Sequence, residues 1–198
     1  MQNDIVYLVW NEGWSAVLRS QAMDVVWILR KMHHTGEVKF MYGVSLRRWR
    51  KDRRSVKQID PSAMVVPVYP WNRNWLKNVF FLSWYLRYCK PAALICRNPV
   101  ATVLALRARA RVNATFKVCY DGRGARAAEV FEYSPDSQLA RDIEAIEREA
   151  VRQSDWRIAV SQALVEHWGE KYALKGNQQT VIPCSLASHF TGPQYSAG

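Results

Sequence analysis

Residues 92–124, AALICRNPVATVLALRARARVNATFKVCYDGRG, decide the fold class of this 198-residue chain. They begin with a short apolar run, Ala92–Cys96, that has the length and composition of a buried strand. A helical pattern through Val103 and Leu106 follows, and a second apolar run, Phe116–Tyr120, leads into a glycine-rich loop. Two such strands joined by a helix predict a βαβ unit, and therefore a parallel sheet.

The same alternation of strand and helix patterns runs through the rest of the chain. We expect further strands at residues 5–10, 38–46, 64–69, 157–160 and 180–183. We expect helices over residues 18–29 and 74–89, behind a cap at Ser134-Pro135, and behind a cap at Ser161. The sequence thus predicts a single Rossmann-like three-layer α/β domain with a parallel sheet of six or seven strands. It covers residues 1–190, and residues 191–198 are a linker or frayed tail.

Composition restricts the class of protein. Hydrophobic residues make up 49% of the sequence and charged residues 23%, which is typical of a globular chain and excludes a disordered one. Lys and Arg together number 28 against 17 Asp and Glu, for a net charge of +11. This balance favours polyanions, anionic membrane surfaces or phosphate-bearing substrates.

Cysteines and apolar segments indicate the compartment. Cys89, Cys96, Cys119 and Cys184 show no metal-ligand spacing, so we interpret them as small hydrophobes in a reducing compartment. The N-terminus lacks the pattern of a signal peptide. The most apolar window, Val79–Leu86, is far shorter than the ~20 residues that span a bilayer. We expect a cytoplasmic protein, at most peripheral on the inner face of the membrane.

The glycine-rich loop contains Gly122–Ala127, which fits the dinucleotide fingerprint G-x-G-x-x-A. That fingerprint also requires a second strand that ends in Asp or Glu about 20 residues later. After Glu129 the chain instead runs through Val130–Tyr133 into the Ser134-Pro135 cap and another helix. We therefore reject a dinucleotide site.

The loop resembles a different family. Asp121, Arg123 and Gly124 form Asp-x-Arg-Gly behind an apolar strand, with Glu129 a few residues later. This pattern resembles the amino-terminal domain of group 1 glycosyltransferases, in which two Rossmann-like domains face each other in the GT-B fold. The family resemblance extends over roughly residues 5–190 and includes further segments: Arg19-Ser20-Gln21, Glu149-Ala150, Ser154-Asp155, Ile158–Ser161, and Val181–Cys184 with Phe190.

The resemblance implies a function and a second domain. In such enzymes the amino-terminal domain holds the acceptor, a glycan or lipid-linked molecule, and transfer retains the stereochemistry. A carboxyl-terminal domain, typically with an E-x7-E pair, binds the nucleotide-sugar donor. This chain has no Glu pair at that spacing and no D-x-D for a metal. We therefore expect no cofactor or metal in this domain, a separate donor-binding domain or partner subunit, and no activity of this domain alone.

Three loops are expected to meet beyond the carboxyl ends of the strands, where ligands bind in parallel sheets. The predicted acceptor- or phosphate-binding residues are Glu12, Gly13, Trp14, Ser15, Arg97, Asn98, Gly122, Arg123, Gly124 and Glu129. Asp121 is the predicted catalytic residue, which orients the acceptor hydroxyl or takes its proton. Structural alternatives stay open: Glu129 pairs with Arg123 or Arg126, Arg97 is a surface arginine, and Trp14 packs in the core.

A strongly basic run lies between two predicted strands, as a loop or short helix. Its candidate members for a membrane or polyanion patch are Arg47, Arg48, Trp49, Arg50, Lys51, Arg53, Arg54 and Lys57. Three interpretations stay open: a solvated surface, a site for anionic lipid headgroups or a lipid-linked acceptor, and a site for nucleic acid. The sequence argues against nucleic acid, because it shows no helix-turn-helix, zinc-finger or RNA-binding signature. A non-catalytic basic binding module is the alternative to the glycosyltransferase hypothesis.

Overall fold

The computed structural model describes residues 3–69, 75–133, 138–174, 176 and 178–183. The sheet strands are β1 (Ile5–Trp10), β2 (Val38–Ser45), β3 (Met64–Val68), β4 (Ala93–Arg97), β5 (Lys117–Gly122), β6 (Trp156–Ala159) and β7 (Gln179–Val181). The helices are α1 (Ala16–Leu18), the π-helical turn η1 (Arg19–Met23), α2 (Asp24–Met32), α3 (Leu46–Ile59), the 3-10 turn η2 (Trp75–Lys77), α4 (Asn78–Cys89), α5 (Pro99–Val112), α6 (Arg126–Tyr133), α7 (Gln138–Gln153) and α8 (Gln162–Tyr172).

The strands form one parallel sheet in the order β3-β2-β1-β4-β5-β6-β7. The chain moves outward from β1 to β3, crosses back to β4 on the other side of β1, and then moves outward to β7. The strand order therefore reverses between β1 and β4. In open parallel sheets ligands bind outside the carboxyl ends of the strands at this switch point, so the topology positions a site after Trp10 and Arg97.

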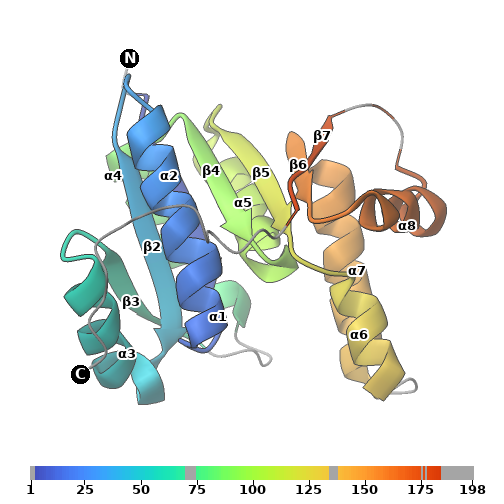
Figure 1. Ribbon diagram of the computed structural model, residues 1–198, viewed down its shortest axis with the longest axis horizontal. Coiled ribbons are helices and arrows are strands. Elements are labelled where there is room, and N and C mark those ends of the chain that lie inside the picture. The colour runs from blue at the N-terminus through green and yellow to red at the C-terminus, as the bar shows by residue number, and fades with distance from the viewer. Residues whose placement is uncertain (1–2, 70–74, 134–137, 175, 177, 184–198) are drawn as a thin grey trace.

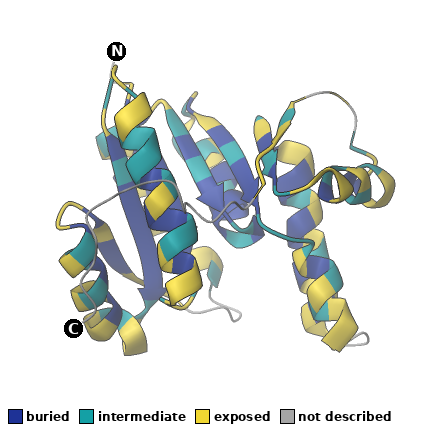
Figure 2. Ribbon diagram, viewed as in Figure 1, coloured by how far each residue is buried: buried dark blue, intermediate teal, exposed yellow. Residues whose placement is uncertain are grey.

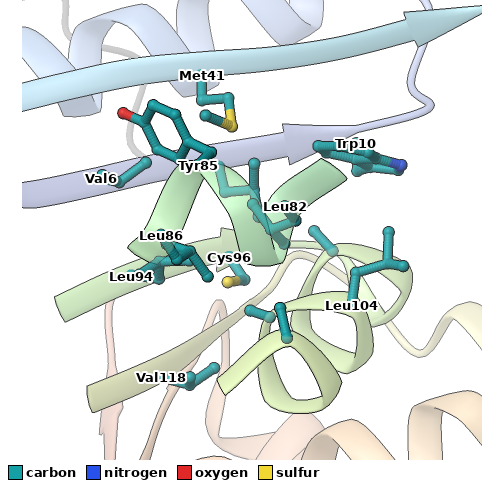
Figure 3. Packing of buried hydrophobic residues seen from close by; sticks show 14 of the residues in the cluster. Val6, Trp10, Met41, Leu82, Tyr85, Leu86, Leu94, Cys96, Leu104 and Val118 are labelled. Carbon is teal, nitrogen blue, oxygen red and sulfur yellow. The ribbon is translucent and has the colours of Figure 1, made fainter. Parts of the chain in front are cut away.

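Helices cover both faces of the sheet (Figure 1). The alternation of side chains along β1 divides the core, with Leu8 packed among residues of α4 and α5 and Val9 packed among residues of α1, α2 and α3. Figure 3 shows Leu82 and Leu86 of α4 against β1 and β4, beside Cys96. The central strands are buried, whereas the outer sides of the helices are exposed (Figure 2). This is the predicted three-layer α/β domain, with seven parallel strands.

Several local predictions differ from the structure. The basic run, expected to be a loop or short helix, lies in the 14-residue helix α3. Val130–Tyr133 belongs to α6, a helix that the sequence did not predict. Because α6 and α7 both follow β5 before β6 begins, the described residues between β5 and β6 contain no strand of the kind that a dinucleotide fingerprint requires. The Ser134-Pro135 cap, Cys184 and the tail 191–198 lie outside the described residues.

Two of the cysteines lie in the interior of the domain. Cys96 is fully buried, and burial raises the pKa of Cys119 to about 12, so both remain neutral thiols at pH 7. This agrees with their interpretation as small hydrophobes.

Among the residues that the structure describes, none of the helices is both long enough and apolar enough to cross a membrane.

Candidate functional site

A cavity of about 730 Å³ opens at the carboxyl edge of the sheet, next to the switch point between β1 and β4. It is lined from several elements, by Trp10, Asn11, Glu12, Gly13, Val17, Gln21, Arg97, Asn98, Pro99, Val100, Tyr120, Arg123, Gly124, Arg126, Glu129, Val130, Leu139 and Ile143. Seven of the residues predicted from the sequence are among them. The cavity is the candidate functional site.

Arg97, the last residue of β4, is the most constrained cation of the cavity. Its side chain is only 8% exposed, and its Nε donates to Glu12 Oε2 at 3.1 Å. Its Nη2 donates to Gln21 Oε1 at 2.7 Å. The remaining nitrogen, Nη1, is buried and has no hydrogen-bond partner among the described residues. A buried guanidinium nitrogen without a partner can donate to a ligand oxygen. The burial of the side chain excludes the alternative of an ordinary surface arginine.

Asn98 fixes the loop that follows β4. Its φ of 75° is a left-handed value that asparagine tolerates better than most residues. Its side-chain oxygen accepts from Ala101 N at 2.9 Å and caps α5, and its Nδ2 donates to Glu12 Oε1 at 2.8 Å and to Trp10 O at 3.0 Å. Asn98 thus joins the loops after β1 and β4 across the switch point.

Asp121 lies at the end of β5 and is completely buried. Its carboxylate accepts from Tyr7 OH at 2.6 Å and forms an ion pair with Arg123, whose Nε lies 2.8 Å from Oδ1. Burial and the neighbouring Asp121 carboxylate raise the pKa of Tyr7 far above its usual range, so its hydroxyl remains a donor. Arg123 lines the cavity and Asp121 does not. The contacts of Asp121 are those of a residue that positions Arg123; its predicted contact with the acceptor stays a prediction.

The start of α6 forms the opposite wall. Arg126 Nη1 donates to Glu129 Oε2 at 3.0 Å, so the predicted pairing of Glu129 with Arg126 is present. The Glu129 carboxylate also covers Gly124, where an added Cβ would lie 2.6 Å from its Oε1. Both side chains of this exposed pair still line the cavity. Gly124 therefore allows the acidic side chain to approach the loop.

Glu147 of α7 accepts hydrogen bonds from the first backbone N–H groups of α6. This fully buried carboxylate accepts from Arg126 N at 3.2 Å and Ala127 N at 2.8 Å, and it also accepts from Tyr172 OH at 3.1 Å. It satisfies backbone donors that the first turn of a helix leaves unpaired. Burial raises the pKa of Glu147, although these hydrogen bonds oppose the shift.

Besides Asp121, three predicted binding residues lie outside the cavity lining. Trp14 packs against the core on the α2 side, with its ring centroid 5.6 Å from that of Tyr42. Ser15 accepts from Leu18 N and caps α1. A Cβ at Gly122 would lie 2.5 Å from the Trp168 ring, so this glycine is required by packing. Their predicted binding roles stay predictions without support from this geometry.

Sequence reasoning missed other contributors to the site. Gln21 was noted only as part of the family resemblance, but it lies in the π-helical turn η1, a feature that often marks functional sites, and holds Arg97. Tyr7 and Glu147 were missed because the sequence does not show that each one reaches a hydrogen-bond partner 20 or more residues away. Within the described ranges, no three His, Cys, Asp or Glu side chains gather as a metal site.

The predicted basic patch is a face of α3. The side chains of Arg47, Arg50, Lys51, Arg53 and Arg54 are exposed. Trp49 points inward, where its Nε1 donates to Val65 O at 3.1 Å and its ring packs against the core. Arg48 pairs with buried Asp52 at 3.3 Å. The patch therefore consists of cations without an exposed tryptophan.

Comparisons with known proteins give a family and a fold. The family model described as Glycosyltransferase Family 4 matches residues 17–186. No curated protein matches the chain in sequence. The structure is similar to the lipopolysaccharide outer core galactosyltransferase WaaB, with a TM-score of 0.63 at 13% identity, over 91% of this chain and 45% of that one.

Two other solved structures illustrate the range of similar proteins. Sucrose-phosphate synthase from Thermosynechococcus elongatus has a TM-score of 0.58 at 13% identity, over 93% of this chain and 48% of that one. A putative UDP-N-acetylglucosamine 2-epimerase from Listeria monocytogenes has a TM-score of 0.62 at 10% identity, over 91% and 45%. The chain thus spans less than half the length of these structures. At such low identity the likeness concerns the fold alone.

Proposed function

The chain belongs to glycosyltransferase family 4, with the fold of an amino-terminal GT-B domain, and from this premise we propose that it binds the acceptor of a retaining glycosyltransferase. A separate domain or subunit is proposed to bind the nucleotide-sugar. In the complete reaction an acceptor hydroxyl oxygen forms a bond to the anomeric carbon of the sugar. The nucleoside diphosphate leaves with the electron pair of the old bond, and the hydroxyl proton is released.

The observation that carries the proposal is the buried Arg97 guanidinium in the cavity, with its unpartnered Nη1. Glu12 and Gln21 fix two of its nitrogens, so the third is oriented before a ligand arrives. Preorganised donors bind sugar hydroxyl or phosphate oxygens without an ordering cost. Arg123 adds a second cation, which Asp121 holds at the rim. This set suits a polyhydroxylated or phosphorylated acceptor.

The class of acceptor is proposed from the same features. A glycan or a lipid-linked sugar phosphate presents the oxygens that these two arginines select. Polysaccharide or lipopolysaccharide assembly in the cytoplasm is the proposed context, and its support is the family together with the fold likeness to a lipopolysaccharide galactosyltransferase. The alternative is a non-catalytic module in which the exposed cations of α3 bind nucleic acid or anionic membranes.

A saccharide-binding experiment tests the proposal. The 198-residue chain is applied to an array of oligosaccharides and sugar phosphates, beside the variants Arg97→Gln and Arg54→Gln. Both variants lose one positive charge, but Arg54 is exposed on α3, outside the cavity. We expect selective saccharide binding that Arg97→Gln weakens about tenfold or more and Arg54→Gln leaves unchanged. Equal losses in both variants, or binding to nucleic acid alone, would refute the proposal.

A further inference from the structure

The outer face of α4 is an exposed aromatic stripe. Phe80, Trp84 and Tyr88 are spaced four residues apart, which aligns them along one side of the helix. Their exposed fractions are 60%, 69% and 84%. Phe81 beside them is 36% exposed. A helix with aromatic residues on its solvent side is unusual in a monomeric globular domain, and contiguous patches of this kind mark interaction surfaces.

The opposite face of the same helix accounts for the packing of α4. Leu82, Tyr85 and Leu86 lie in the core against β1 and β4, with exposed fractions of 4% or less (Figure 3). Asn78 anchors the start of the helix by bonding both backbone groups of Tyr69, at 2.9 and 3.0 Å. The inner face and Asn78 therefore hold α4 in the fold without the outer aromatic stripe, so the stripe is available to bind a partner.

Positive charge surrounds the stripe. Lys77, Arg87 and Lys90 of the α4 region are exposed, and the Arg111 guanidinium of α5 lies 4.1 Å from the centroid of the Phe80 ring. The sequence contains no acidic residue between Asp60 and Asp121. This long stretch, which includes all of α4 and α5, therefore presents only cations and neutral side chains to a partner.

We propose that the outer face of α4 docks the protein on an anionic phospholipid bilayer. Trp, Tyr and Phe prefer the boundary between headgroups and acyl chains, and flanking Lys and Arg attract anionic headgroups. An amphipathic helix lying in the plane of the interface uses these same two features. The proposal does not depend on which ligand occupies the cavity.

Charge complementarity selects this occupant over others. Two copies of the chain that met through this face would bring like charges together, with no acidic side chain from residues 61–120 to pair with them. Nucleic acid would favour α3, where cations are denser; this helix packs on the other face of the sheet. A bilayer accepts cations and aromatic rings side by side, which is the arrangement on α4.

The start of α4 lies at the same edge of the sheet as the candidate cavity. η2 and the start of α4 lie at the carboxyl edge of β3, because Asn78 is bonded to Tyr69 directly after that strand. The candidate cavity opens at the same edge of the sheet. A protein docked along α4 therefore has the first turn of its docking helix at the edge of the sheet where the cavity opens, while the rest of the helix leads away to the start of β4.

Vesicle sedimentation tests the inference with two triple variants. The full chain is mixed with vesicles of phosphatidylcholine alone or with a third of phosphatidylglycerol, at low and high salt. One variant is Phe80→Ser, Trp84→Ser, Tyr88→Ser; the matched control is Arg50→Gln, Arg53→Gln, Arg54→Gln on α3. We expect the wild type to bind only the anionic vesicles. The α4 variant should bind about a hundredfold more weakly, and the α3 variant within about threefold of the wild type.

Additional measurements keep the outcome decisive. Circular dichroism and the urea midpoint verify folding, and the single variant Trp84→Ser, which should also weaken binding, covers the case in which the triple variant does not fold. Quenching of tryptophan fluorescence by brominated lipid should be lost in Trp84→Ser. The inference is overturned if the wild type ignores anionic vesicles, or if the α3 variant alone loses binding. It is equally overturned if α4 instead mediates a dimer in solution or binds an oligonucleotide in preference to vesicles.

Discussion

Arg97 and Asp121 lie opposite each other in the register of β4 and β5, yet each is paired with a different residue. Arg97 binds Glu12, and Asp121 binds Arg123 and Tyr7. Both buried charges are thus compensated, as burial of an ion requires. The sequence identified these two residues by their place after a strand, but it did not show that Tyr7, 114 positions before Asp121, supplies a hydrogen bond.

The hydrogen bond from Tyr7 to Asp121 is expected to stabilise the domain. In Tyr7→Phe the carboxylate loses a buried donor while the ring remains, so the free energy of unfolding should fall by about 1–3 kcal/mol. Urea denaturation at pH 7 measures this change. Tyr88→Phe is the matched control, because Tyr88 is 84% exposed and its loss of a hydroxyl should change stability by less than about 0.5 kcal/mol. Equal stability of Tyr7→Phe and wild type would contradict this account of Asp121.

Helix α6 shows what can be predicted at the scale of an element. The sequence predicts no helix at Val130–Tyr133, only a run of residues that leads into the Ser134-Pro135 cap of the next helix. The structure makes it a helix whose first backbone N–H groups are satisfied by Glu147 from α7 rather than by a local cap. Local patterns cannot reveal a cap that comes from another helix. By contrast, the Ser161 cap of α8 was predicted, since its partner is Leu164 N.

Glu147 should therefore be required for α6. In Glu147→Gln one carboxylate oxygen becomes an NH₂ group, which cannot accept from the backbone, so stability at pH 7 should fall by about 1–3 kcal/mol. Because burial raises the pKa of Glu147 in the folded state, its contribution to stability is largest at low pH and declines as the pH rises above the usual glutamate value. The variant should lack this decline. Urea denaturation at several pH values measures both effects, with exposed Glu170→Gln as the control; identical pH profiles for Glu147→Gln and wild type would be inconsistent with this assignment.

Asp155, between α7 and β6, is expected to give stability the opposite pH dependence. Burial alone would raise its pKa, but the Val118 N–H, at 2.8 Å, and the Arg109 guanidinium hold the pKa below its usual value. Its contribution is therefore present at neutral pH and lost as the pH falls through the folded-state pKa. Asp155→Asn should lower stability at pH 7 by about 1–2 kcal/mol and flatten the loss of stability in acid. Thermal unfolding between acid and neutral pH tests this; exposed Asp142→Asn should retain the acid loss.

At the scale of the whole molecule, the alternation of strands and helices was sufficient to predict the sheet. Continuous apolar runs such as Ile5–Trp10 indicate strands buried on both faces, as in a parallel sheet covered by helices. The order of the strands, with its reversal between β1 and β4, comes from the structure and was not predicted. Surface properties were less predictable. The sequence indicates that α4 is a very apolar helix, but it does not indicate which side of the helix packs in the core and which side is exposed. Trp49 was predicted to be exposed, but it packs inward.

The division of labour proposed for the complete enzyme predicts that this domain alone does not bind the donor tightly. Isothermal titration of the 198-residue chain with UDP-glucose, UDP-galactose and UDP-N-acetylglucosamine should give dissociation constants no tighter than about 1 mM, a free energy near 4 kcal/mol. The same chain should transfer no sugar from these donors to saccharide acceptors. Micromolar nucleotide-sugar binding that Arg97→Gln abolishes would instead make the cavity a donor site.

The cavity at the carboxyl edge of the sheet is the central claim, and mapping a bound saccharide by NMR tests it most directly. The chain is labelled with ¹⁵N and titrated with the saccharide that binds best on the array. We predict that amide shifts concentrate at Gly13, Asn98 and Gly124, and that the Asn98 side-chain amide, which bonds Glu12, also moves. Shifts confined to α3 or α4, with these groups unmoved, would contradict the account.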